Sequence, residues 1–131
     1  MWLTSLTKKK VAKHWLCHFN KKLIAILELH TFSSLNETFL SQYSGTMDEA
    51  DQAIIFCDEI ILAQKGAKKI DLLRIKELFS NLELEYFSSS ENLEKYLGNL
   101  SYDNKALLLM SSGNFGNMNL LTLKDKILSK Y

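Results

Sequence analysis

Proline is absent from all 131 residues, so no connection in this chain is stiffened by a proline ring. No apolar run approaches the roughly 20 residues that a membrane-spanning helix needs. The apolar start, residues 1–6, is too short for a secretory signal, and its lysines lie on the wrong side of it. We therefore expect a cytoplasmic location and no membrane partner.

Cysteine is nearly absent too, because only Cys17 and Cys57 are present and they form no C-x-x-C pair. This excludes a disulfide framework and a zinc ribbon, and it favours a reducing compartment. His14, Cys17 and His18 stand at i, i+3 and i+4, a spacing that could gather metal ligands on a helix. No fourth ligand is obvious, so we interpret them as helix residues at the margin of the core and expect no metal site.

An excess of one charge is also lacking, since 16 basic residues face 15 acidic ones and leave a net charge of +1. That balance does not indicate a nucleic-acid partner. Lysines do cluster near the start of the chain. They are Lys8, Lys9, Lys10 and Lys13, followed by Lys21 and Lys22. A solvated helix face is the simpler explanation of this cluster, and a phosphate-binding patch is the alternative.

Apolar residues make up 47% of the chain, enough for one compact domain with a buried core. Short continuous apolar runs alternate with segments of helical periodicity. The predicted strands are Leu23–Leu27, Ala53–Cys57, Leu84–Phe87 and Ala106–Met110. The predicted helices are residues 6–19, one opened by the capping box 34–37, one capped by Asp71, one opened at 88–91, and a last one around 120–128.

This alternation predicts an α/β domain with a Rossmann-like, three-layer architecture and a mainly parallel sheet ordered 3-2-1-4. We assign residues 1–131 to this single domain and regard residues 1–9 as atypical. In this order the first and fourth strands are neighbours, and their carboxyl ends flank the topological switch point, where ligands bind in such folds. Two loops should open there, residues 28–34 and 111–116.

Both loops have polar chemistry suited to a ligand. Ser111, Ser112, Gly113, Asn114, Phe115 and Gly116 form the glycine loop, which follows a strand and precedes a helix. Its backbone N–H groups could hold an anion, or its glycines could simply serve a structural turn. His30, beside hydroxyl residues, could contact a ligand or transfer a proton, or it could be bonded to the backbone.

Several catalytic motifs are missing from the chain: G-x-x-x-x-G-K-[ST], G-x-G-x-x-G and G-x-S-x-G. Without the P-loop motif G-x-x-x-x-G-K-[ST], the chain has no lysine in position to hold the β- and γ-phosphates of ATP. We therefore assign no catalytic residue and no cofactor to this chain, and expect it to be inactive by itself.

Two segments resemble the C-terminal domain of the Mur ligases, which build the peptide of bacterial cell-wall precursors. Residues 22–34, KLIAILELHTFSS, are similar to that family's apolar strand followed by P-H-x-[YF]-[ST]-R, and an Ala-Asp pair at 50–51 precedes the next strand. Residues 107–121, LLLMSSGNFGNMNLL, are similar to its fourth strand and glycine loop. The S-S-G-N-F-G form looks most like the branch that joins recycled murein tripeptide to UDP-N-acetylmuramate.

The resemblance implies an ATP-dependent peptide ligase in which this domain binds the incoming amino acid or peptide. ATP and magnesium would act in a central domain, and a further N-terminal domain would hold the UDP-sugar. Those two domains, UDP-N-acetylmuramate and murein peptide are the implied partners. The implied substrate-binding residues are His30, Phe32, Ser33 and Ser34 in one loop and residues 111–116 in the other. A binding module without catalysis is the alternative function.

The chain departs from the family pattern at three places. Ser34 stands where the motif has arginine, and Leu29 stands where it has proline. The D-D-[FY]-A-H-H-P motif that opens the family's domain is replaced by residues 1–8. We expect weak substrate affinity from this chain alone.

Overall fold

The computed structural model describes residues 20–29, 37–64, 66, 71–111 and 114–130. Its four strands are β1 (Lys22–Glu28), β2 (Gln52–Phe56), β3 (Glu85–Phe87) and β4 (Lys105–Met110). They form one parallel sheet in the order β3-β2-β1-β4. The predicted strands and their order are confirmed, with β1 and β4 as neighbours and β3 at an edge.

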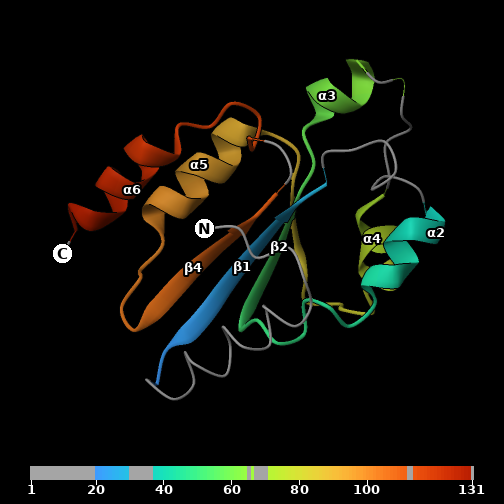
Figure 1. Cartoon of the computed structure of the whole chain (residues 1–131), viewed down its shortest axis with the longest axis horizontal. Helices are drawn as coiled ribbons and strands as arrows, with labels where there is room; N and C mark the ends of the chain where they lie inside the picture. Colours follow the sequence, from blue (N-terminus) through green and yellow to red (C-terminus); the bar gives the residue numbers. More distant parts are fainter. Residues whose placement is uncertain (1–19, 30–36, 65, 67–70, 112–113, 131) are drawn as a thin grey trace.

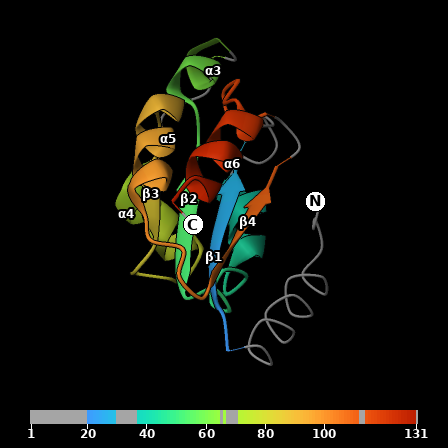
Figure 2. The same ribbon diagram turned by 90° about the vertical axis from the view of Figure 1, so that its left-hand side faces the viewer.

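Helices cover both faces of this sheet. Because side chains on both faces are covered, the strands have apolar residues at consecutive positions. The α2 helix (Glu37–Leu40), the short 3-10 turn η2 (Ser41–Tyr43) and α4 (Leu72–Leu78) lie on one face. The α5 helix (Ser90–Asn99) and α6 (Leu120–Leu128) lie on the other (Figures 1 and 2). The helix expected over residues 6–19 lies outside the described residues.

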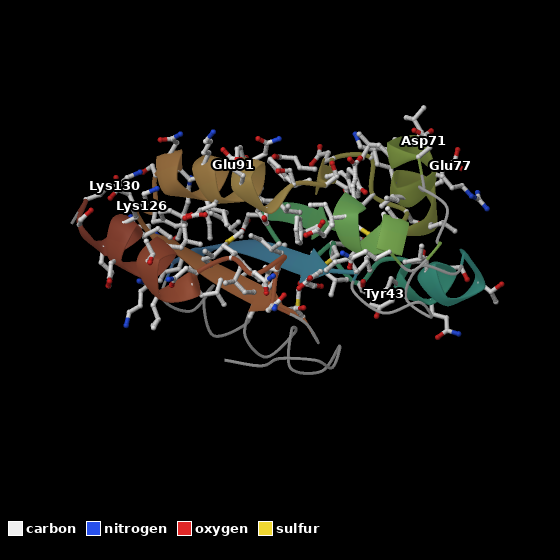
Figure 3. All side chains as sticks on the ribbon, turned by 90° about the horizontal axis from the view of Figure 1, so that it is seen from above. Tyr43, Asp71, Glu77, Glu91, Lys126 and Lys130 are labelled. Atoms are coloured by element: carbon white, nitrogen blue, oxygen red, sulfur yellow. The ribbon has the colours of Figure 1, made fainter. Side chains whose placement is uncertain are left out.

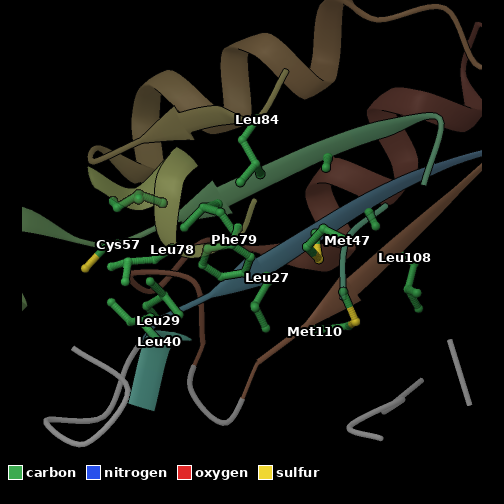
Figure 4. Packing of buried hydrophobic residues seen from close by; sticks show 14 of the residues in the cluster. Leu27, Leu29, Leu40, Met47, Cys57, Leu78, Phe79, Leu84, Leu108 and Met110 are labelled. Carbon is green, nitrogen blue, oxygen red and sulfur yellow. The ribbon is translucent and has the colours of Figure 1, made fainter. Parts of the chain in front are cut away.

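The face that carries α2 and α4 is built from every second residue of the strands. Figure 4 shows Leu27 of this face beside Phe79, and Phe79 is completely buried. Tyr43 stacks on Phe79 with ring centroids 5.5 Å apart. Ile75 and Leu78 of α4, and Phe79 directly after it, are buried here, whereas Leu72 is exposed.

The opposite face uses the alternate strand residues, among them Ile24, Ile26 and Phe56. Leu93 and Leu97 of α5 and Leu123 of α6 pack against them. Leu121 and Leu128 of α6 are exposed. Figure 3 shows labelled charged residues such as Glu91, Lys126 and Asp71 at the outside of the helices, away from the sheet.

One helix was not predicted. The α3 helix (Glu59–Gln64) occupies a stretch that we expected to be a loop, and it sits beyond the carboxyl end of β2 (Figure 1). Its six residues are too few for a clear helical period, and only Leu62 is buried. No helix in the described part of the chain is long and apolar enough to cross a membrane.

Candidate functional site

The carboxyl ends of the neighbouring strands β1 and β4 meet at one place in the sheet. The pairing of Leu27 with Met110 places the next residues, Glu28 and Ser111, beside each other. Both are buried, with exposed fractions of 5% each. Glu28 lies on the same side of β1 as Ile24 and Ile26, and therefore faces the α5–α6 side of the sheet.

Glu28 holds the glycine loop at two of its residues, Ser111 and Phe115. One of its oxygens, Oε2, accepts a hydrogen bond from the hydroxyl of Ser111. The same oxygen accepts the backbone N–H of Phe115 at 2.8 Å. A buried carboxylate that accepts two such bonds is strongly held, because each bond to a charged acceptor is worth more than a neutral one. One carboxylate thus ties the loop after β4 to the end of β1.

The turn that follows Phe115 needs an unusual backbone. Phe115, Gly116 and Asn117 all have positive φ angles, of 54°, 65° and 62°. Glycine and asparagine tolerate positive φ angles. The remaining residue, Phe115, is held in this conformation by its burial against Phe56, with ring centroids 6.1 Å apart. Asn114 closes the turn, since its side-chain oxygen accepts the N–H of Asn117 at 3.2 Å and its amide nitrogen donates to Asn117 Oδ1 at 2.6 Å.

Gly116 brings this loop against the ends of β2 and β3. A Cβ atom at Gly116 would overlap Oδ2 of Asp58 and would lie 3.1 Å from Cβ of Ser90. The other oxygen of Asp58, Oδ1, accepts the N–H of Ile60 at 2.8 Å and so supports the start of α3. Backbone hydrogen bonds connect the other strand ends. Leu29 N–H donates to the Phe56 carbonyl, and Glu59 N–H donates to the Ser88 carbonyl.

Two further ionisable groups lie at this end of the sheet. Burial raises the pKa of the Cys57 thiol to about 12, and the carboxylates of Asp58 and Glu28 add to the effect. Burial also raises the pKa of the Tyr86 phenol, which hydrogen-bonds to Cys57. Cys57 is therefore a protonated thiol near neutral pH and no nucleophile. Its role is that of a small core residue.

The structure describes four of the ten residues that we predicted to bind substrate. Ser111 and Phe115 are buried, Gly116 is half-buried, and Asn114 is exposed. The other six lie outside the described residues: His30, Phe32, Ser33, Ser34, Ser112 and Gly113. The two loops do begin side by side, since Glu28 and Ser111 are in contact. Direct contact with substrate stays a prediction for all ten residues.

Sequence reasoning missed the residues that organise this site, Glu28 and Asp58. The sequence places Glu28 at the start of the loop 28–34, and Asp58 directly after the strand predicted to end at Cys57. The signal for Glu28 was available, because a carboxylate directly after a buried central strand must find donors or pay a desolvation cost. Strand order 3-2-1-4 also placed it next to Ser111. Nothing in the sequence indicated that Asp58 would contact Gly116.

The described part of this site can position and orient a ligand. Among the described residues, no three His, Cys, Asp or Glu side chains come close enough to hold a metal ion. The exposed amide of Asn114 still has a second N–H and a second lone pair to offer. Phe115 N–H, by contrast, already donates to Glu28. The site therefore has the chemistry of a binding surface.

The fold is shared with domains of Mur-type ligases. The chain superposes on a domain named as part of a UDP-N-acetylmuramate:L-alanyl-gamma-D-glutamyl-meso-diaminopimelate ligase of Haemophilus ducreyi, with a TM-score of 0.56 and 14% identity over 99% of this chain and 86% of that one. It also superposes on a murein peptide ligase of Psychrobacter arcticus, with a TM-score of 0.61 and 17% identity over 98% of this chain.

This chain covers 26% of the Psychrobacter ligase, so that enzyme contains much more than the shared domain. At these identities the comparison establishes the fold, and the resemblance predicted from residues 22–34 and 107–121 is confirmed at that level. No family model and no curated protein matches the sequence.

Proposed function

We propose that this chain is the C-terminal, substrate-binding domain of a Mur-type ligase that joins a murein peptide to UDP-N-acetylmuramate. The observation that carries the proposal is the fold shared over nearly the whole chain with two ligases of this type. The strands that open the two family-like motifs, β1 and β4, also pair in this fold and end together at its switch point.

In this role the chain would orient the peptide, and catalysis would need the other domains of the ligase. ATP and magnesium would bind elsewhere, because this sequence has no P-loop. Glu28 would act as a positioning residue, because it holds the glycine loop that faces the ligand. The peptide would then contact the outer surface of that loop, where Asn114 is exposed.

A titration of the chain with murein tripeptide, followed by NMR, tests this proposal. We expect the amides of Asn114 and Gly116 to shift together with those of residues 28–34, while Lys105 at the other end of β4 does not move. His30→Ala should weaken this response severalfold, since it removes one polar contact worth about 1 kcal/mol. The matched control is His18→Ala, because the sequence prediction places His18 outside the site.

Shifts confined to other parts of the chain, or no shift at about 10 mM tripeptide, would contradict binding at this surface. The alternative function, a binding module that does not serve a ligase, would be favoured if other carboxylate peptides gave the same shifts. Steady phosphate release from ATP by the pure chain, in the presence of magnesium and both substrates, would contradict the assignment of ATP chemistry to other domains.

A further inference from the structure

A cavity lies at the opposite end of the sheet from the site described above. Its volume is about 470 Å³, within the range of small-molecule sites. It is formed by the amino ends of β1 and β4 and by the residue before β2. Its lining residues are Asn20, Lys21, Lys22, Asp51, Asp103, Asn104 and Lys105. The length of β1 separates it from Glu28 by about 20 Å.

Two lysines are forced together in this cavity by the register of the sheet. Lys22 and Lys105 are direct partners on the parallel strands β1 and β4. Like charges on directly opposed strand residues repel each other and destabilise the sheet. Lys21 adds a third ammonium group to the same cavity. Among the residues that the structure describes, no carboxylate forms an ion pair with any of these lysines.

Hydrogen bonds hold the walls of the cavity in place. Lys22 N–H donates to the carbonyl of Asn104 at 2.8 Å. Leu23 N–H donates to Oδ2 of Asp51 at 2.7 Å, and Asp51 N–H returns a bond to the Leu23 carbonyl at 2.9 Å. The Asp51 carboxylate is thus directed at the backbone of β1. A fixed cradle loses little freedom when it binds a ligand, which favours affinity.

The asparagines add neutral donors to this cradle. Asn20 and Asn104 both have positive φ angles, of 55° and 53°, where the chain turns into β1 and β4. Their side-chain amides can donate hydrogen bonds to oxygen atoms. One further carboxylate, that of Asp103, lines the cavity, and the hydroxyl of Ser101 donates to it at 3.4 Å. Three ammonium groups against two carboxylates leave the cavity with a positive balance.

We propose that this cavity is a second binding site, distinct from the switch-point surface, for a compact multivalent anion such as a diphosphate or a tricarboxylate. The anion would lie between Lys22 and Lys105 and neutralise the repulsion that the strand register imposes. Lys21 and the asparagine amides would contact its remaining oxygen atoms. Binding would therefore stabilise the amino ends of the paired strands β1 and β4.

The test uses inorganic pyrophosphate and the whole 131-residue chain at low ionic strength. We expect a dissociation constant on the order of 1 mM or tighter. Amides of residues 20–23 and 103–105 should shift, and the melting temperature should rise with ligand. Lys22→Gln and Lys105→Gln should each weaken binding about tenfold, because each removes a close charge. Either substitution also relieves the repulsion, so both variants should fold at least as well as the parent.

Lys124→Gln on α6 is the matched control, because it removes one exposed lysine that does not line the cavity. A parallel titration with citrate identifies the anion, since tighter binding of pyrophosphate indicates a phosphorylated ligand and tighter binding of citrate indicates a polycarboxylate. The proposal fails if neither anion binds at about 10 mM, or if Lys124→Gln weakens binding as much as Lys22→Gln does. None of these outcomes depends on murein tripeptide, so the proposed function is tested separately.

Discussion

Glu28 is the residue on which the candidate site most depends. It is a buried carboxylate at the end of the central strand, and it accepts bonds from two parts of the glycine loop. Removing the side-chain acceptor leaves buried donors unsatisfied, whereas replacing the carboxylate with an amide keeps one acceptor oxygen and loses the charge and the second oxygen. Alanine at this position should therefore lower the free energy of unfolding more than glutamine does.

We predict that Glu28→Gln lowers the free energy of unfolding by about 1 to 2 kcal/mol and that Glu28→Ala lowers it by about 2 to 4 kcal/mol. The alanine variant leaves both the Ser111 hydroxyl and the Phe115 N–H without this acceptor. Urea denaturation measures the difference. Glu83→Gln is the control, because Glu83 is exposed and the same exchange there should change stability little. Equal stabilities of the two Glu28 variants would contradict the role given to these bonds.

The strands could be predicted well because helices cover both faces of the sheet, and β1 and β2 are buried along nearly their whole length. The apolar runs around Ile26, Ile55 and Leu108 have no polar interruption, and only a covered parallel sheet accommodates several of them. The α3 helix could not be predicted, because it has six residues and buries only Leu62. The contact of Gly116 with Asp58 joins residues 58 positions apart in sequence, and no local pattern encodes such a contact.

Gly116 brings the glycine loop close to Asp58, at the start of α3. Gly116 has a φ of +65°, and an added Cβ would overlap Asp58. We predict that Gly116→Ala lowers the free energy of unfolding by about 2 to 4 kcal/mol, from both backbone strain and steric overlap. Denaturant titration again provides the measurement.

Gly66→Ala provides a close control for this substitution. Gly66 has nearly the same φ, +64°, and nothing lies within 4 Å of an added Cβ. It should therefore lose only the backbone contribution, about 1 kcal/mol. The difference between the two variants measures the contact with Asp58. If both variants lose the same stability, the loop does not depend on close approach to α3.

The sheet, whose fold is shared with ligase domains, carries different polar groups at its two ends. The carboxyl end carries the buried carboxylate of Glu28 and the candidate peptide surface, and the amino end carries the lysine cavity. The first end could be predicted because strand order places it at the switch point. The second could not be located from sequence, because only the register of the sheet brings Lys105, from the last strand, next to Lys22.

Alkaline pH should destabilise the whole fold, because its buried weak acids must stay protonated. Burial raises the pKa of Cys57 from 9.0 to about 12, and it also raises the pKa values of Tyr43, Tyr86 and Tyr96 above 10.0. Above pH 9 the unfolded chain therefore releases protons that the folded chain retains. Since the folded state then binds more protons, the free energy of unfolding falls as pH rises.

We predict that stability is constant near neutral pH and falls between pH 9 and about pH 12, with Cys57 contributing up to about 1.4 kcal/mol per pH unit. Urea midpoints measured across this window provide the test. Cys57→Ala removes one of the groups and should make the decline shallower, although its stability at neutral pH is lower because of the lost packing. A decline of equal slope in Cys57→Ala and the parent would show that the thiol ionises as readily in the folded chain as in the unfolded one, and that its burial between Asp58 and Tyr86 does not protect it.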